Sequence, residues 1–389
     1  MSLFDHEGEP MDSMDEETLA LLKLSNCEGI GSESIHRLIE QFGSAARALE
    51  AARGDLLQVE GLGETLAGRI RRGPDMARVE SELDLMERAR TRLIGIGSED
   101  YPVPLRHLGT SAPPLIYVRG QIQRRDMLSV AIVGSRNCTH YGRSQSRRFA
   151  MSLTGMGFTI ISGLARGIDT EAHRGALQAK GRTIALLGCG LARVETLEDP
   201  ELALSICENG ALISELPMQA PPLPRHFPPR NRLISGLSLG VVVVQASKRS
   251  GSLITARWAG EQGKSVFALP GQVDSPSSHG CHQLIRDGAV LVETPREVLD
   301  ELGPISEPLP PPAGGEEEEA EENQEAPAYA VPLTDSQKRV LQLLGTSPCQ
   351  IDTIIDETGM APSLVSSTLL TLEIRGIVRQ LPGQTYVRE

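Results

Sequence analysis

Four loops of this sequence combine glycine or serine with arginine or lysine, a combination that suits phosphate binding. Glycine and serine before a helix present unpaired backbone N–H groups, hydroxyl donors and the positive end of the helix dipole. One such loop is weak evidence, because Gly-Ser turns are common, but four in series indicate a phosphate-binding face. The loops span residues 133–136, 162–169, 228–235 and 248–252, and their cations are Arg136, Arg166, Arg230, Arg232, Lys248 and Arg249.

Motifs for other chemistries are missing or incomplete. The sequence lacks the dinucleotide fingerprint G-x-G-x-x-G, the Walker sequence and the nucleophile elbow G-x-S-x-G. No set of cysteines and histidines has the spacing of a metal site, so we expect neither cofactor nor metal. Asp169 and His173 lie one helical turn apart and can share a helix face. They are either an acid–base pair or, as the pattern favours, a capping carboxylate beside a buried histidine.

The elements that would position the four loops are aliphatic strands alternating with helices from residue 128 onward. Continuous aliphatic strands of this kind are typical of a parallel sheet covered on both faces. The fold class is therefore predicted as α/β, with a doubly wound, Rossmann-like sheet, in which ligands bind at the carboxyl ends of the strands. The predicted strands cover residues 129–134, 158–163, 183–188, 211–215, 240–246, 265–271 and 289–293.

Smaller domains are predicted on both sides of this sheet. Residues 18–95 are predicted to form helical segments, the last of them over 79–93. The turns Gly29-Ile30-Gly31 and Gly61-Leu62-Gly63 predict a pair of helix-hairpin-helix units, for which we expect a mainly structural role. Residues 333–389 predict a winged helix-turn-helix with its wing at Pro382-Gly383. The last helix and the wing carry few cations, Arg375, Arg379 and Arg388, which favours a module that binds protein over one that binds DNA. The other predicted segments are an acidic disordered tail at 1–17, the Rossmann-like domain at 96–303, which begins with a Pro-rich connector, and a Pro/Glu-rich linker at 304–332.

Composition and charge exclude a membrane-spanning helix and are compatible with a polyanionic ligand. The chain has 389 residues, of which 40% are hydrophobic, and its longest aliphatic run is far shorter than the ~20 residues of a membrane helix. Six scattered cysteines and an acidic N-terminus without an apolar stretch predict a cytoplasmic protein with reduced thiols. The formal charge is −13, yet residues 119–300 carry 21 basic and 15 acidic side chains. A polyanion can therefore bind the centre, because fields at contact distance are local.

Aromatic residues are scarce, at 3% of the chain. Those in the basic centre, Phe227 among them, are expected in the core, so stacking platforms for bases are not predicted. Binding of a nucleic acid would then rest on phosphate contacts and tolerate any sequence.

Between residues 118 and 302 the chain closely resembles the DNA-processing protein A (DprA/Smf) family. The resemblance rests on AIVGSR, SGLARGID with a following AH, LISELP, FPPRNRLISGLS, RSGSLITARWA and ALPG, in this order. Gln245 stands where the family usually has an acid, His282 where it has Asn, and the segment after Gly190 lacks the usual Asp and Tyr-Pro. The resemblance implies that single-stranded DNA phosphates contact Gly134, Ser135, Arg136, Ser162, Gly163, Arg166, Arg230, Asn231, Arg232, Lys248, Ser250 and Gly251.

The family resemblance also implies a biological role. The expected protein is a cytoplasmic homodimer that binds and protects single-stranded DNA during natural transformation. It would load the RecA recombinase onto that strand and displace single-strand binding protein. Two alternatives remain: a phosphoribohydrolase-type nucleotide enzyme with Asp169, His173 and residues 250–256 in its pocket, and a regulator that binds duplex DNA through the winged helix.

Overall fold

The structure is a computed structural model that describes residues 14–302, 335–344 and 349–360 and, beyond them, residues 362, 365, 368, 369, 372, 378–381 and 385–388. These residues fall into two compact units, divided between residues 307 and 308. The predicted linker at 304–332 and most of the predicted acidic tail lie outside the described residues. No helix among the described residues is long and apolar enough to cross a membrane.

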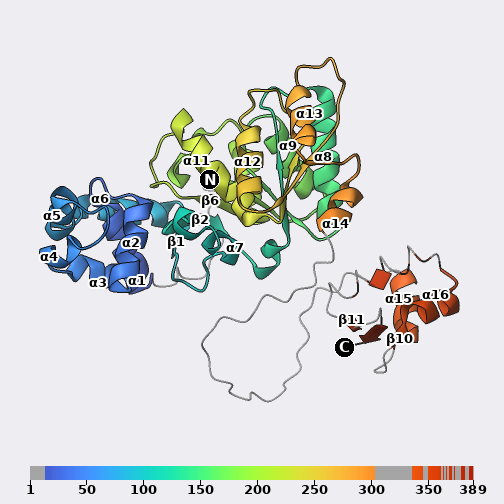
Figure 1. The fold of residues 1–389 in the computed structure, drawn as a ribbon, viewed down its shortest axis with the longest axis horizontal. Coiled ribbons are helices and arrows are strands. Elements are labelled where there is room, and N and C mark those ends of the chain that lie inside the picture. Colours follow the sequence, from blue (N-terminus) through green and yellow to red (C-terminus); the bar gives the residue numbers. More distant parts are fainter. Residues whose placement is uncertain are drawn as a thin grey trace, which may run out of the picture. The chain divides into compact units, whose positions relative to one another are not determined.

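The first unit is built on a nine-stranded sheet with the order β1-β2-β6-β5-β4-β3-β7-β8-β9. Figure 1 labels β1, β2 and β6 of this sheet. From β6 to β9 all neighbours are parallel, and the order reverses between β3 and β7, which lie side by side. The predicted doubly wound parallel sheet is therefore confirmed. Its strands are β3 (Ser129–Val133), β4 (Thr159–Ser162), β5 (Thr183–Leu186), β6 (Gly210–Ser214), β7 (Gly240–Val243), β8 (Ser265–Ala268) and β9 (Val290–Leu291).

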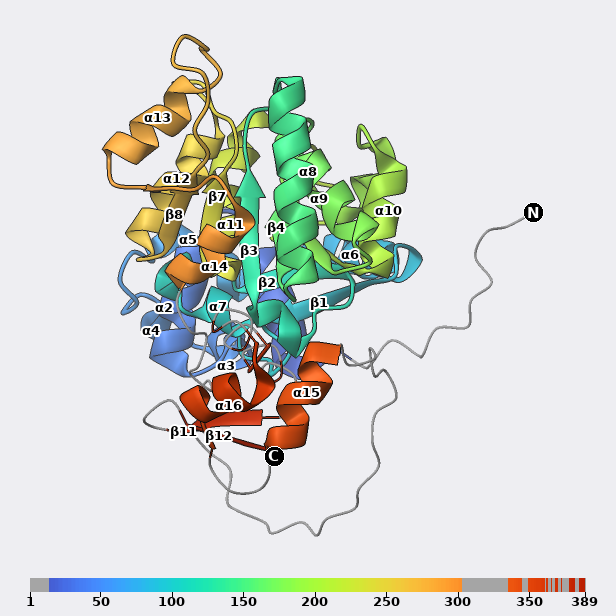
Figure 2. The ribbon, with the colours of Figure 1, turned by 90° about the vertical axis from the view of Figure 1, so that its right-hand side faces the viewer.

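Helices cover both faces of the sheet because successive side chains of each strand point to opposite sides. In β3, Val130 and Ile132 belong to the core on one face, whereas Ala131 and Val133 belong to the core on the other. Figure 2 shows the two helical layers on either side of β3 and β4. The first layer holds α8 (His140–Gly155), α9 (Ile168–Gln178), α10 (Pro200–Glu208) and α14 (Pro295–Leu302), and the second holds α7 (Val103–Arg106), α11 (Phe227–Leu237), α12 (Ser252–Glu261) and α13 (His279–Arg286).

Two strands of the sheet were not predicted. The helix expected over residues 79–93 ends earlier, and β1 (Thr91–Gly95) pairs with β2 (Leu115–Gly120), which lies in the expected Pro-rich connector. The helix α6 (Met76–Arg88) stops before Arg90, whose φ of 48° is left-handed. The strand β2 then pairs antiparallel with β6. Partners distant in sequence stabilise both short strands, so local patterns do not reveal them.

The N-terminal helices form two hairpins that bind each other's turns. Arg69 of α5 donates to the carbonyl of Glu28 at 2.9 Å, and Arg37 of α2 donates to that of Glu60 at 2.9 Å. Each arginine lies against the first glycine of the opposite turn, Gly29 or Gly61, whose φ is near +80°. This reciprocity supports a structural role for the hairpins. The helices are α1 (Glu16–Ser25), α2 (Ser32–Phe42), α3 (Ala45–Glu50), α4 (Arg53–Leu56), α5 (Glu64–Arg72) and α6.

Helix α1 begins inside the predicted disordered tail of residues 1–17, so that prediction was wrong for its last two residues. Asp15 caps the helix by accepting from the backbone N–H of Thr18 at 2.7 Å. The carboxylate of Glu17 in turn accepts from the N–H groups of Ala45 and Ala46, which begin α3. Acidic residues are favoured at both positions by the positive end of a helix dipole.

The second unit is a small winged helix domain, as predicted. Helices α15 (Asp335–Leu343) and α16 (Ile351–Thr358) pack with a three-stranded antiparallel sheet of order β10-β12-β11. The core contains Val340, Ile354 and Leu369. The predicted wing turn Pro382-Gly383 and Arg375 lie outside the described residues, as do the side chains of Arg379 and Arg388. The strands are β10 (Cys349–Gln350), β11 (Val378–Leu381) and β12 (Thr385–Arg388).

Candidate nucleic-acid interface

The loops that follow β3, β4 and β7 meet at the carboxyl edge of the sheet, where the strand order reverses. The N–H of Ser135 donates to the carbonyl of Gln245 at 2.8 Å, and the N–H of Ile168 donates to that of Ser135 at 3.3 Å. A Cβ on Gly134 would lie 2.5 Å from the side chain of Ile168. The segments after β3, β4 and β7 are thus one connected surface, as expected for the ligand site of such a sheet. The loop predicted over residues 228–235 is wrong, because these residues belong to α11, where the two prolines lie in the first turn of a helix.

Glycines allow these loops to approach each other. A Cβ on Gly163 would lie 2.7 Å from Nη2 of Arg230 and 2.9 Å from Oδ2 of Asp169. Gly167 has a φ of 94°, and a Cβ there would lie 2.7 Å from the carbonyl oxygen of Arg136. A side chain at either position would push the loops apart.

Asp169 and Arg230 are buried behind the loops and hold them in place. Asp169 is 7% exposed and accepts from the N–H of Gly163 at 3.2 Å. Burial raises the pKa of Asp169 to about 6, although Arg230 and backbone N–H groups oppose the rise. Arg230 is 4% exposed and donates to the carbonyl oxygens of Gly163, at 2.9 Å, and Leu186. Burial lowers the pKa of Arg230 to about 10 against the attraction of Asp169.

The exposed cations of the predicted loops are Arg136, Arg166, Lys248 and Arg249. The guanidinium of Arg136 lies over the ring of Phe227, 4.8 Å from its centroid. Arg166 donates to Oδ1 of Asn137 at 2.6 Å, and a weak 3.8 Å contact links it to the exposed Glu198. Within the described part of the chain, Lys248 has no acidic partner. These four side chains are available to phosphates in solution.

The remaining predicted residues also lie at this edge, but several use their polar groups within the protein. Arg232 binds both carboxylate oxygens of Glu215, at 2.7 and 2.6 Å, and the carbonyl of Ser111 at 2.8 Å. The hydroxyl of the buried Ser162 donates to the carbonyl of Ile132 at 2.6 Å. Phosphate contact by Arg230, Arg232 and Ser162 stays a prediction, and the geometry gives all three a structural role.

The start of α12 is joined to the same edge through α11. The side-chain amide of Asn231 donates to the carbonyl of Gly251 at 3.4 Å, and the neighbouring hydroxyls of Ser250 and Ser252 are 2.8 Å apart. Ser250 is partly exposed and Gly251 is exposed. This loop therefore presents a hydroxyl and helix-start N–H groups beside Lys248.

Three residues that organise the site were missed as functional by sequence reasoning. Phe227, expected in the core, is only half-buried and supports Arg136. Asn137 orients Arg166. Gln245 accepts from the N–H of Thr139 at 2.8 Å and donates to the hydroxyl of Ser277 at 3.1 Å. The one available signal was the position of Phe227 within FPPRN, beside the cations of a predicted loop.

His173 is fully buried and lies apart from the exposed edge. The hydroxyl of Thr183 donates to the carbonyl of Ile160 at 2.8 Å, so it accepts from Nδ1 of His173 at 2.7 Å. That leaves Nε2 as an unprotonated nitrogen with no hydrogen-bond partner among the residues that the structure describes. Burial and the nearby Arg230 lower the pKa of His173 to about 3. Neither His173 nor Asp169 presents its side chain to a substrate in this structure.

The buried histidine predicts a pH dependence of folding. An unfolded histidine takes up a proton near pH 6.5, whereas His173 in the folded state resists protonation down to about pH 3. The free energy of unfolding should therefore fall as the pH drops from about 6.5 toward 3. Asp169, whose pKa is raised to about 6, contributes with the opposite sign between about pH 6 and 4.

Urea denaturation at several pH values measures this dependence. A His173→Gln variant should lose less stability on acidification than the parent, and a His140→Gln control at an exposed histidine should behave like the parent. Equal losses in the parent and in His173→Gln would show that His173 is not the titrating group.

Comparison with known proteins agrees with this architecture in all three regions. Residues 92–303 match the family DNA recombination-mediator protein A, residues 324–384 match the DprA winged helix domain, and residues 15–53 match the DprA-like N-terminal HHH domain. The structure of DNA processing protein A from Streptococcus pneumoniae superposes with a TM-score of 0.64 at 34% identity, covering 74% of this chain and 99% of that one.

Relatives of similar length show the same likeness in sequence. Protein Smf of Escherichia coli (strain K12) is 41% identical over 311 residues, which are 80% of each chain. Protein Smf of Synechocystis is 33% identical over 389 aligned residues, covering 94% of this chain and 98% of that protein. Because the main family match spans more than half of the sequence and both flanking domains match as well, the chain belongs to the DNA processing protein A (DprA/Smf) family.

Proposed function

We propose that this protein binds single-stranded DNA, with little sequence preference, along the carboxyl edge of its parallel sheet. In homologous recombination and natural transformation it would protect the incoming strand and load RecA recombinase onto it. The observation that carries the proposal is the joining of the loops after β3, β4 and β7 into one surface with exposed Arg136, Arg166 and Lys248.

The chemistry of this surface favours phosphate contact over base reading. Guanidinium groups and backbone N–H groups bind phosphate oxygens of any nucleotide. The ring of Phe227 is already in contact with Arg136, and the hydroxyl of the exposed Tyr141, at the start of α8, donates to the carbonyl of Pro270 at 3.0 Å. A strand held mainly by its phosphates is bound whatever its bases, which explains the expected tolerance of sequence.

Several parts of the role rest on family membership and on the physical character of the chain. Homodimerisation, contact with RecA, displacement of single-strand binding protein and a cytoplasmic location are part of the proposal. The enzyme alternative lacks support because Asp169 and His173 are buried. The described residues also contain no cluster of three or more side chains able to hold a metal ion.

A salt-titrated comparison of single-stranded and duplex DNA tests the proposed function. The protein should prefer oligo-dT to a duplex of equal length, and log K should fall with log[salt] by about 0.7 per phosphate contact. Arg136→Ala and Arg166→Ala should each weaken oligo-dT binding by ~1–2 kcal/mol and make the slope shallower. RecA filament formation on a strand covered by single-strand binding protein should fail in the same variants.

Arg257→Ala serves as the matched control, because Arg257 is an exposed arginine on the outer side of α12. It should bind like the parent. Equal affinity for single strands and duplexes would contradict the loading role. Parental binding by both edge variants at every salt concentration would contradict the assigned site.

A further inference from the structure

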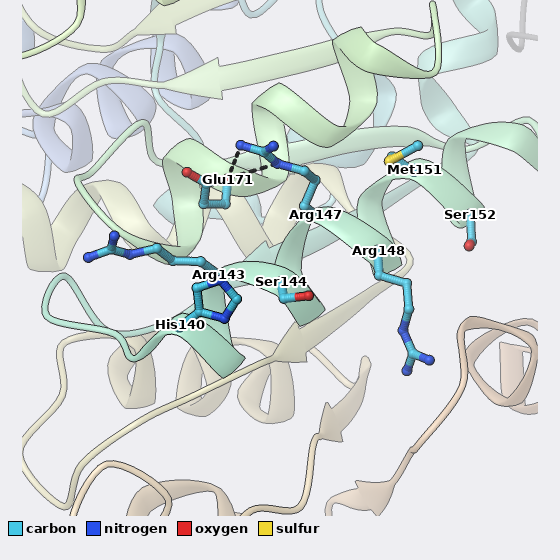
Figure 3. Close-up of a pocket in the computed structure, with 8 residues that line it drawn as sticks. All are labelled: His140, Arg143, Ser144, Arg147, Arg148, Met151, Ser152 and Glu171. Atoms are coloured by element: carbon cyan, nitrogen blue, oxygen red, sulfur yellow. Dashed lines mark hydrogen bonds and ion pairs between the residues drawn. The ribbon is translucent and has the colours of Figure 1, made fainter.

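We propose that a groove along the outer face of α8 carries the same DNA strand beyond the carboxyl edge of the sheet. The groove would be a second stretch of one phosphate-binding path, and this inference rests on the proposed function. Its volume is about 490 Å³. Figure 3 shows its lining residues, which are His140, Arg143, Ser144, Arg147, Arg148, Met151, Ser152 and Glu171.

The groove carries an excess of positive charge. Glu171 is its acidic residue, and it accepts from Nε and Nη2 of Arg147 at 2.9 and 2.6 Å and from Arg174 at 3.1 Å. Figure 3 shows Arg147 turned toward Glu171, whereas Arg143 and Arg148 extend away from that ion pair. Arg148 donates to the backbone carbonyl of Glu293 at 2.8 Å, which leaves its charge unbalanced.

Arg143 is the arginine of this groove that makes no polar contact with the rest of the described protein. It is exposed, and among the described residues it has no hydrogen-bond or acidic partner. It lies one turn before Arg147 on the same helix, and like charges at this spacing destabilise a helix. A phosphate bound at Arg143 would offset that repulsion and give its guanidinium group a partner, whereas Arg147 already has Glu171.

The groove is joined to the carboxyl edge by a rigid connection. Helix α8 begins directly after the loop of Ser135 and Arg136, and its cap, Thr139, accepts from the N–H of Gly142 at 3.3 Å. Gln245 binds the N–H of Thr139 through its side chain and the N–H of Ser135 through its carbonyl. From His140 to Ser152 the helix extends about 18 Å. A strand leaving the edge beside Arg136 can therefore continue over several phosphates along α8.

The lining chemistry favours a nucleic acid over an acidic protein. Three of the eight lining residues are arginines, whose planar guanidinium groups match phosphate oxygens in pairs. Met151 is the one large apolar side chain among them, whereas the cores of protein interfaces are rich in apolar and aromatic contacts. The same DNA strand is the polyanion that the neighbouring edge already binds in the proposed function.

Binding of oligo-dT of two lengths by the full chain tests the inference. A strand of about 6 nucleotides fits on the edge alone, and one of about 20 reaches α8. Arg143→Gln should lower the affinity for the long strand about three- to tenfold and reduce the salt slope of its binding by about 0.7. The affinity for the short strand should not change. Glu171→Gln removes the negative charge of the groove and should raise the affinity for the long strand about threefold. Arg257→Gln is the matched control and should bind both lengths like the parent.

The outcomes separate failure of this inference from failure of the proposed function. If Arg143→Gln binds both lengths like the parent, or weakens both equally, the groove is not an extension of the path. Competition by poly-glutamate that depends on Arg143, without any effect on long DNA, would identify an acidic protein as the occupant and overturn the inference. Arg136→Ala should lower the affinity for strands of both lengths. If this variant bound both strands like the parent, the edge site itself would be overturned.

Discussion

An Arg230→Ala variant is expected to lose about 3–5 kcal/mol of folding stability, which is the usual effect of removing one partner of a buried charge pair. Arg230 is 4% exposed, donates to the carbonyl oxygens of Gly163 and Leu186, and balances the buried Asp169. The variant would leave these oxygens and a buried carboxyl group without their partner. Urea unfolding followed by circular dichroism measures the loss.

Arg136→Ala is the control for this experiment because Arg136 is exposed at the same edge. It should change stability by no more than about 0.5 kcal/mol, as surface substitutions usually do. If Arg230→Ala were as stable as the parent and bound DNA poorly, Arg230 would be a phosphate contact, as the family resemblance implies. The pair of variants thus separates a residue that builds the site from one that touches the ligand.

A Gly167→Ala variant is expected to lose at least about tenfold in affinity for oligo-dT. Gly167 has φ 94° and ψ −121°, a conformation that costs other residues ~1–3 kcal/mol. The added methyl group would also meet the carbonyl oxygens of Ser135 and Arg136. To relieve these contacts the β3 loop must move away from α9, and Arg136 and Arg166 would then no longer share one surface.

Gly260→Ala is the matched control for this substitution. Gly260 lies inside α12, has open space around its Cα and is exposed. Alanine is favoured over glycine in a helix, so this variant should gain about 0.5–1 kcal/mol of stability and keep its affinity. Oligo-dT titration of both variants checks the prediction, and unchanged binding by Gly167→Ala would show that the loop tolerates a side chain.

Much of the fold could be predicted because local patterns of hydrophobic residues and glycines indicate its strands, helices and turns. Aliphatic runs such as residues 240–246, each followed by a helical segment, indicated the parallel sheet, and the paired Gly-x-Gly turns indicated the helical hairpins. The strands β1 and β2 could not be predicted in this way. They are short, lie among charged and proline residues, and owe their conformation to pairing with each other and with β6.

At the candidate site, local sequence was enough to predict which residue types gather at the carboxyl edge of the sheet, because the segments that follow parallel strands begin there. Which of these side chains face solvent became clear from the packing of the whole fold. Arg136 and Arg230 look equivalent as cations in glycine- or proline-rich loops, yet one lies exposed on Phe227 and the other is buried against Gly163 and Asp169. Exposure depends on which distant segments pack over a side chain, and that packing is a property of the whole fold rather than of the residue and its neighbours in the chain.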